Sequence, residues 1–274
     1  MKIFGKQQKL NSDGKIPLKF KLGLALSGGG TRGFAHIGVL RAFEENRIGF
    51  DCVAGTSAGS LMGAMYCAGV SLDDIIEEGK NVRRKDVLNS RIVIGSESAN
   101  IAKIADKLLC DKTFDDLSTP FAAVAVDITE GREVVLNSGN VSQAVSASCA
   151  VPALFKPVEI DGMLLVDGGL LNNMPADVCR RMGAEIVIGV DLNHNRGKGT
   201  QSRKLVDTLV ATWNITTKST MYKGYHNSDI VIEPELSQYK NTSLSYIDEM
   251  VEEGYRAAMA KMDEIKELLQ IRRR

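Results

Sequence analysis

The residues with the clearest potential for chemistry are Gly-Thr-Ser-Ala-Gly at positions 55–59. They match the G-x-S-x-G nucleophile elbow, a tight turn between a strand and a helix that holds the serine hydroxyl clear of the backbone. Ser57 would be the nucleophile that attacks an acyl group. Gly55, Ala58 and Gly59 would be the small neighbours that the turn requires.

The residues around this motif predict the two elements that an elbow joins. Residues 51–54, which are apolar after Asp51, indicate a strand, and residues 60–67 indicate a buried helix that Gly69 closes. A bare G-x-S-x-G match arises by chance in about one chain of this length in ten. The hypothesis of a serine nucleophile therefore depends on what else the sequence places near Ser57.

A glycine-rich segment follows an earlier predicted strand. Apolar residues 22–26 lead into Ser-Gly-Gly-Gly-Thr-Arg-Gly at positions 27–33, after which apolar residues recur at helical spacing up to Asn46. Backbone amides that no side chain shields, at the N-terminus of a helix, are suited to hold a negatively charged oxygen. We therefore expect this loop to be the oxyanion hole for an attack by Ser57.

The same loop also satisfies the dinucleotide-binding pattern G-x-G-x-x-G through Gly28, Gly30 and Gly33. That function needs an acidic residue at the far end of the next strand, where it would bind the ribose hydroxyls. Asp51 instead opens the second strand, and the Ser57 motif occupies the strand's exit. Ligands of open α/β sheets bind at strand exits, so we expect the loop and Ser57 to face one crevice. A nucleotide-binding oxidoreductase is the alternative function.

A third predicted strand exit carries an aspartate. The dipeptide Asp161-Gly162 predicts a hairpin turn, and the strand after it, residues 163–166, leads into Asp167-Gly168-Gly169. An aspartate at a strand exit, followed by two glycines, is positioned like a functional carboxylate with an open backbone around it. An ordinary turn aspartate is the alternative interpretation, and without other evidence it is the more common one.

Composition excludes several classes of protein. The chain has 274 residues, of which 44% are hydrophobic and 25% charged, which are ordinary globular values. No apolar run is long enough to span a membrane. Lys and Arg number 34, as do Asp and Glu, so the broad basic surface of a nucleic-acid-binding protein is not expected. Scattered cysteines and an N-terminus without an apolar signal core favour the cytoplasm.

Basic residues gather at both ends of the chain. Residues 1–21 contain six lysines and one acid, and residues 272–274 are arginines. Such ends could contact an anionic membrane surface at its inner face, which would make the protein peripheral there. A solvated tail is the interpretation that we favour.

The pattern of elements predicts an α/β protein, a single α/β/α domain with a mostly parallel central sheet. Antiparallel hairpins are expected around residues 129–131 and 161–162. A helix is predicted from Ser71 to about Lys80, residues 81–100 are expected to be irregular, and another helix begins at Ile101.

These motifs, taken in order, resemble those of the patatin-like phospholipase family. Residues 28–33 are similar to its oxyanion loop, residues 55–59 to its nucleophile elbow and residues 167–169 to its Asp-Gly-Ala/Gly motif. Residues 147–157 are also similar, so the resemblance spans about 22–192. It implies a three-layer patatin-like fold, with residues 1–20 as a basic lead-in and residues 21–274 as the catalytic domain.

The resemblance also implies an activity, that of a serine hydrolase acting on acyl esters of lipids through a Ser-Asp dyad. No catalytic histidine, metal or other cofactor is implied. Ser57 would be the nucleophile and Asp167 the base, with Gly168 and Gly169 completing the acid motif. Arg32 would set the loop or meet a phosphate head group. The implied oxyanion hole consists of Gly28, Gly29, Gly30, Thr31 and Arg32.

Two alternatives to the dyad stay open at this point. A carboxylate with a pKa near 4 is a weak base toward a hydroxyl, so Asp167 would have to be desolvated or short of hydrogen-bond donors. The chain order Ser, Asp, His also allows a triad with His194, which follows a strand end, or less readily with His226. His36 is expected to be a hydrogen-bonded core residue. The other alternative is a non-catalytic lipid-binding protein.

Overall fold

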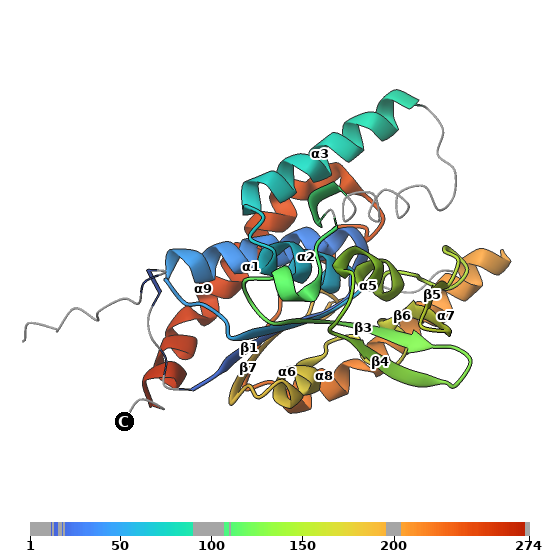
Figure 1. Cartoon of the computed structure of the whole chain (residues 1–274). Coiled ribbons are helices and arrows are strands. Elements are labelled where there is room, and N and C mark those ends of the chain that lie inside the picture. Colours follow the sequence, from blue (N-terminus) through green and yellow to red (C-terminus); the bar gives the residue numbers. More distant parts are fainter. Residues whose placement is uncertain are drawn as a thin grey trace, which may run out of the picture.

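The computed structural model describes residues 12, 14, 15, 18, 20–89, 107–109, 111–195 and 204–271. In this part of the chain, an eight-stranded sheet lies between helices on its two faces (Figure 1). The strand order is β5-β6-β3-β2-β1-β7-β8, and β4 pairs with β3 outside this path. The strands are β1 (Leu22–Leu26), β2 (Cys52–Thr56), β3 (Phe121–Asp127), β4 (Arg132–Leu136), β5 (Val158–Ile160), β6 (Met163–Asp167), β7 (Ile186–Val190) and β8 (Ile230–Ile232).

The sheet is mostly parallel, as predicted. Strands β3, β2, β1, β7 and β8 pair with one another in parallel, whereas β4 and β6 pair antiparallel with β3, and β5 pairs antiparallel with β6. Both predicted hairpins form: β3 and β4 flank residues 129–131, and β5 and β6 flank Asp161-Gly162. The parallel strands deliver their carboxyl ends to one edge of the sheet.

Helices cover both faces (Figure 1). One face carries α1 (Phe34–Glu45), α2 (Ala58–Cys67), α3 (Leu72–Asn89), α5 (Val141–Ser148) and α9 (Ile247–Ile271). The other carries α6 (Ala176–Arg181) and α8 (Met221–Asn227), with α7 (Leu205–Ser219) beside them. Short 3-10 helices are η1 (Gly30–Gly33), η2 (Phe114–Asp116), η3 (Gly168–Leu170) and η4 (Leu244–Tyr246).

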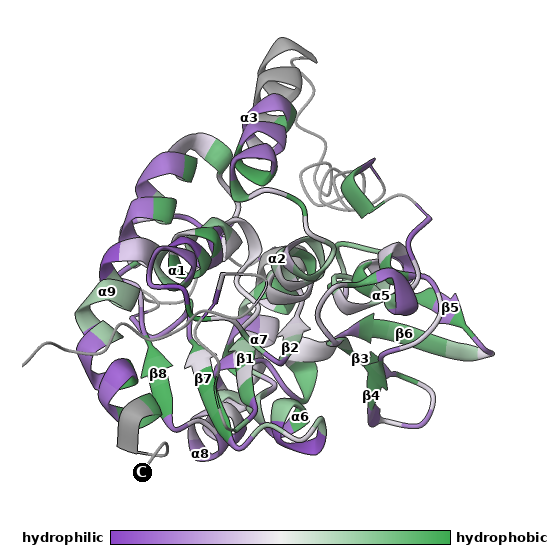
Figure 2. Ribbon diagram, turned by 60° about the vertical axis from the view of Figure 1, so that its left-hand side comes forward, coloured by the Kyte–Doolittle hydropathy of each residue, from purple (hydrophilic) through white to green (hydrophobic). Residues whose placement is uncertain are grey.

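Strand β3 divides its side chains between two hydrophobic cores. Phe121, Ala123 and Ala125 belong to the larger core beneath α1 and α2, whereas Ala122 and Val124 belong to a second core with α6. This alternation follows from the two-residue period of a strand. Because helices cover both faces, the strand is buried throughout. Figure 2 shows hydrophobic strands at the centre and hydrophilic residues along the outer side of α9.

Helices α1 and α9 are in close backbone contact. A Cβ atom added to Gly38 of α1 would lie 1.8 Å from the carbonyl oxygen of Val251, and one added to Gly254 of α9 would lie 1.9 Å from that of Ala35. The apolar stripe of α9 faces this contact and is packing, as its spacing predicts. Two glycines therefore allow α9 to seal the larger core.

The prediction for α3 is wrong at its C-terminal end. Its start is confirmed, because the Ser71 hydroxyl accepts a hydrogen bond from the amide of Asp74. The helix continues past Lys80 to Asn89, since residues 81–89 contain no glycine or proline and several good helix formers. Residues 90–106 lie outside the described residues, as do most of the basic lead-in and residues 272–274.

Within the described ranges, none of the helices combines the length and the hydropathy that a membrane crossing requires.

The contact between α1 and α9 yields the first testable prediction. Replacing Gly38 with Ala should destabilise the protein by about 1–3 kcal/mol, because the methyl group overlaps backbone atoms of α9. In an unpacked helix the same change would stabilise by about 1 kcal/mol, so the sign is diagnostic. Thermal and urea unfolding, with the exposed Glu252→Ala of α9 as control, measure the effect. A Gly38→Ala variant as stable as the parent would contradict the packing.

Candidate active site

Ser57 lies on a strained turn between β2 and α2. Its backbone angles are φ 53° and ψ −124°, in a region that residues with a side chain rarely occupy. The flanking glycines permit this turn. A Cβ atom at Gly55 would lie 2.4 Å from the carbonyl oxygen of Gly59, and one at Gly59 would lie 2.1 Å from that of Leu26. The elbow predicted from the sequence is therefore present in its backbone.

A buried serine of α5 holds the elbow in place. The amide of Ser57 donates to the hydroxyl oxygen of Ser148 at 2.9 Å, and that hydroxyl donates to the carbonyl oxygen of Val124 at 2.6 Å. Ser148 thereby connects the strained residue to the central strand β3. No local motif predicts this role of Ser148, although the residue lies within the family-like segment 147–157.

The register of β3 brings Asp167 to Ser57. Val124 pairs with Thr56 of β2, and the next residue, Ala125, pairs with Asp167 of β6. β4 follows the opposite edge of β3 across all these positions. Because a strand has only two edges, β6 continues on the edge that β2 leaves. Asp167 at the end of β6 therefore faces Ser57 just beyond the end of β2.

The Asp167 carboxylate is buried and poorly solvated. Its residue is 1% exposed; Oδ1 accepts a 2.8 Å hydrogen bond from the amide of Gly169, and Oδ2 is buried without a hydrogen-bond partner among the described residues. Burial raises the pKa of Asp167 to about 7, against the lowering effects of the nearby Ser57 hydroxyl and the Gly169 amide. A carboxylate needs such desolvation to act as a base toward a hydroxyl.

Gly168 keeps the acid motif in contact with the sheet. A Cβ atom there would lie 2.3 Å from the carbonyl oxygen of Val124. This is the carbonyl that also accepts from Ser148. The hydrogen bonds that hold Ser57, and the segment after Asp167, thus meet at one peptide group of β3.

Two amides of the glycine loop are free to bind an anion. The amide of Gly28 donates to the carbonyl oxygen of Asn173 at 3.1 Å, and that of Thr31 to Asn241 at 3.0 Å. The amides of Gly29 and Gly30, which lie between them, have no hydrogen-bond acceptor in the part of the chain that the structure describes. Of the five residues expected to form the oxyanion hole, Gly28 and Thr31 therefore use their amides to anchor the loop. Gly29 and Gly30 are left as the candidate amide donors.

Arg32 also anchors the loop. Its guanidinium is buried and donates to the carbonyl oxygen of Tyr239 from Nε at 3.0 Å and from Nη2 at 2.7 Å. Burial lowers the pKa of Arg32. Of its two predicted roles, the structure supports setting the loop and leaves the guanidinium engaged away from a phosphate head group. On the other side, Asn193 Nδ2 donates to the carbonyl oxygen of Gly28 at 2.7 Å.

A cavity of about 120 Å³ joins these elements. Its polar floor includes Ser57, Asp167 and the glycine loop, and its other walls come from the segment after α5 and from α7. The cavity lining also includes three asparagines that no sequence motif predicts, Asn173, Asn193 and Asn241. The apolar wall residues are Val151, Leu154, Val210 and Trp213.

A smaller apolar cavity of about 20 Å³ lies behind Gly30, between α2 and α3. That volume holds about one water molecule. The larger cavity is thus the space beside Ser57 that an ester group can enter.

Cys149 is the other nucleophilic side chain near Ser57. Its sulfur lies 3.9 Å from the Ser60 hydroxyl, and burial raises the pKa of the thiol to about 12. A neutral thiol is a weak nucleophile. Cys149 therefore does not compete with Ser57.

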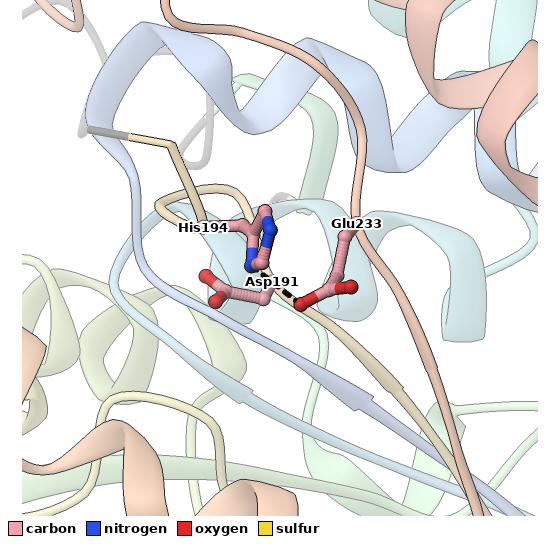
Figure 3. Close-up of side chains that lie close together, drawn as sticks. All are labelled: Asp191, His194 and Glu233. Atoms are coloured by element: carbon pink, nitrogen blue, oxygen red, sulfur yellow. Dashed lines mark ion pairs between the residues drawn. The ribbon is translucent and has the colours of Figure 1, made fainter. Parts of the chain in front are cut away.

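His194 forms an ion pair with a residue that, like itself, does not line the pocket. Its Nδ1 lies 2.6 Å from Glu233 Oε1 in an ion pair beside Asp191 (Figure 3). The Tyr225 hydroxyl lies 2.9 Å from Asp191 Oδ2 and 2.5 Å from Glu233 Oε1, so the polar atoms of this cluster bind one another. His194 is not among the residues that line the Ser57 cavity. The structure gives no support to a His194 triad.

The other two histidines are no better placed. His36 is fully buried, its Nε2 lies 2.8 Å from the carbonyl oxygen of Ser27, and burial lowers its pKa to about 4. This agrees with the expected core role. His226 is exposed in the last turn of α8.

The position of Asp51 disfavours a dinucleotide site. Its carboxylate accepts from the amide of Leu22 at 2.8 Å, at the start of β1 and away from the exits of the strands. A Cβ atom at Gly30 would lie 2.3 Å from the carbonyl oxygen of Asn241. Backbone thus covers one side of the loop, where a pyrophosphate would need an open approach.

Comparisons with known proteins agree on one family. The model of the family described as patatin-like phospholipase matches residues 24–180, more than half of the chain. An uncharacterised NTE-family protein of Mycobacterium tuberculosis is 34% identical over 180 residues, 63% of this chain and 49% of that protein. Human patatin-like phospholipase domain-containing protein 6 is 33% identical over 205 residues, 70% of this chain and 15% of that protein.

The solved structure of VipD from Legionella pneumophila has a similar fold. The TM-score is 0.53 at 15% sequence identity, over 93% of this chain and 69% of that one. At this identity the likeness concerns the fold alone, and it confirms the predicted α/β architecture. The chain spans about half the length of the mycobacterial relative and a smaller share of the human one.

The raised pKa of Asp167 predicts a pH dependence of stability. The folded-state pKa of about 7 exceeds the ordinary value of 3.8, so between these values the folded protein binds the extra proton. This contribution makes the protein most stable below pH 4 and is lost as pH rises through 7. Replacing Asp167 with Asn removes it. The variant should therefore gain stability relative to the parent between pH 4.5 and 8, by roughly 3–4 kcal/mol.

Urea unfolding of both proteins across this pH range measures the difference. Other groups, such as His36, titrate equally in both and cancel. Parallel stability curves for the parent and Asp167→Asn would contradict a desolvated carboxylate at this position.

Proposed function

Because the chain belongs to the patatin-like phospholipase family, we propose that it hydrolyses acyl esters of lipids, with Ser57 as nucleophile and Asp167 as base. One observation carries this assignment of roles. The Asp167 carboxylate is buried, has an unpartnered oxygen and lies beside a serine on a strained elbow. A carboxylate with a pKa near 7 is matched to proton transfer at neutral pH.

The first step forms an acyl-enzyme. Asp167 accepts the proton of the Ser57 hydroxyl while Ser57 Oγ attacks the carbonyl carbon of the ester. The carbonyl oxygen becomes negative and is stabilised by the amides of Gly29 and Gly30, which have no competing acceptor. When the tetrahedral intermediate collapses, the bond to the alcohol oxygen breaks, and protonated Asp167 returns its proton to that oxygen.

The second step releases the acid. Asp167 takes a proton from a water molecule, whose oxygen attacks the acyl carbon through the same oxyanion hole. The bond to Ser57 Oγ then breaks, and Asp167 reprotonates the serine. An alcohol can replace water here, so acyl transfer follows from the same intermediate.

The lipid nature of the substrate is supported by family membership and by the cavity. Val151, Leu154, Val210 and Trp213 give the space beside Ser57 an apolar side opposite its polar floor. An ester joined to an acyl chain has the same division. We assign the acyl chain to this apolar side.

We expect three variants to separate the dyad from the alternatives. Ser57→Ala and Asp167→Asn should each lower kcat/KM for a lipid ester by at least about a thousandfold, because each removes a group that takes part in bond making. His194→Gln should retain activity within about threefold, since His194 binds Glu233 outside the cavity. Radiolabelled phospholipid, lysophospholipid and neutral ester assays provide the rates. A loss in His194→Gln equal to that in Ser57→Ala would refute the dyad.

A fluorophosphonate probe separates an enzyme from a non-catalytic lipid-binding protein. An activated Ser57 should be labelled in the parent and not in Ser57→Ala. An oxidoreductase would instead bind NAD or NADP tightly, and binding would survive Ser57→Ala.

The pKa of Asp167 also predicts the pH profile of the reaction. A base must be unprotonated, so kcat/KM for a soluble ester should rise about tenfold per pH unit below 7 and level off above it. The residual rate of Asp167→Asn should lack this inflection. A profile of the parent that is flat from pH 5 to 8 would exclude Asp167 as the base.

A further inference from the structure

The outer side of α7 is an exposed apolar surface next to the Ser57 cavity. Leu205 and Ile215 have 73% and 72% of their surface exposed, and Leu209 is also exposed. These residues lie on the side of the helix opposite the one that lines the cavity. The inner side carries Val210, Trp213, Asn214 and Thr217. One helix thus has the cavity on one side and exposed aliphatic groups on the other.

The polar groups on this outer side make hydrogen bonds within the helix. The hydroxyl of Thr208 donates to the carbonyl oxygen of Lys204 at 3.1 Å, that of Thr212 to Thr208 at 2.9 Å and that of Thr216 to Thr212 at 3.1 Å. A hydroxyl with a backbone partner four residues earlier loses little when water is removed. The threonines therefore do not oppose transfer of this surface out of water.

Two lysines flank α7, whose sequence contains one acidic residue, Asp207, outside the outer side. Lys204 precedes the helix and Lys218 lies in its last turn, and both are exposed. Among the exposed positions of α7 whose side chains the structure describes, none is acidic. An uncharged apolar surface between two lysines complements an anionic layer of head groups above a hydrocarbon interior.

From this arrangement we propose that the outer face of α7 docks the protein on a lipid surface. The outer face is defined by Leu205, Thr208, Leu209, Thr212, Ile215 and Thr216. The proposal rests on the proposed function, because it takes the cavity to receive a lipid ester.

A single helix is about 10 Å across, so docking through its outer face would hold the mouth of the cavity about that distance from the lipid layer. A lipid could then reach Ser57 along α7. The acyl chain of a lipid that leaves the layer would contact the apolar residues Val210 and Trp213 first.

The size of the face favours a lipid surface over a protein partner. A stable protein interface covers about 800 Å² on each partner. Three aliphatic side chains on one helix are too few for that, whereas an interfacial helix needs only a row of apolar side chains and basic neighbours.

Vesicle binding by the full chain tests the proposal. Ser57→Ala is used as the parent, so that bound lipid is not consumed. Sedimentation with vesicles of phosphatidylcholine, and of phosphatidylcholine with phosphatidylglycerol, measures apparent affinity. The variants are Leu205→Gln with Ile215→Gln on the face, Lys218→Gln at its edge, and Met259→Gln, an exposed residue of α9, as the matched control.

We expect the double variant to bind both kinds of vesicle at least about tenfold more weakly, because two exposed aliphatic groups no longer leave water. Lys218→Gln should weaken binding only to the anionic vesicles, and more so at low salt. Met259→Gln should bind like the parent. With Ser57 restored, the double variant should hydrolyse a short soluble ester at the rate of the unmodified protein, which also shows that it is folded.

Three results would overturn the docking surface. The first is that the parent does not bind vesicles, and the second is that the double variant binds them as tightly as the parent does. The third is that the parent is a dimer, and that the double substitution dissociates this dimer without changing vesicle binding. The outcome is independent of catalysis. Vesicle binding through α7 without ester hydrolysis would refute the proposed function alone, and hydrolysis of soluble esters without vesicle binding would refute the docking surface alone.

Discussion

The candidate site depends on one feature of the sheet, the edge of β3 on which β2 ends and β6 takes over. Thr56 and Asp167 pair with consecutive residues of β3, so Ser57 and the Asp167 carboxylate meet wherever this register is kept. A shift by one residue would turn every side chain of the strand to the opposite face. The alternating cores above and below β3 prevent that shift, because Ala123 and Val124 are each buried against a different set of helices. Packing far from Ser57 thereby fixes the position of Ser57 relative to Asp167.

The same edge explains why the site contains so little side-chain volume. The carbonyl oxygen of Val124 accepts from Ser148 and is the atom that a side chain at Gly168 would strike. At the end of β1, a side chain at Gly59 would likewise strike the carbonyl oxygen of Leu26. These glycines let backbone approach backbone, and that close approach leaves Gly29, Gly30 and Asp167 lining one cavity. A fold that brings its strand exits this close together needs glycine at those positions, whatever reaction takes place there.

Local chemistry decides which parts of this arrangement can be predicted from the sequence. The elbow at Ser57 and the loop at Gly28 need particular small residues, so their spacing could be recognised, and short apolar runs predicted strands β1, β2 and β6. The roles of Arg32, Asn173 and Asn241 depend on segments that meet only in the folded chain, and no local pattern marks them. The end of α3 was misplaced for the opposite reason: residues 81–89 have ordinary helix propensity, and only a stop signal would have ended the helix at Lys80. His194 shows the limit of chain order, because its strand-end position suggests a role that its contact with Glu233, away from the cavity lining, does not support.

The burial that would make Asp167 a base also costs stability. Raising its pKa from 3.8 to about 7 corresponds to roughly 4 kcal/mol at neutral pH, a large share of the free energy of unfolding of a typical domain. A histidine near Ser57 would have an ordinary pKa close to 7 without this cost. A side chain stays in such a destabilising environment only where the surrounding structure leaves it no alternative. Here β6 is held by β3 and β5, and the amide of Gly169 fixes one carboxylate oxygen, so that Asp167 cannot turn toward water. The rigid sheet therefore holds a carboxylate at a pKa of about 7, close to the value that an imidazole has intrinsically.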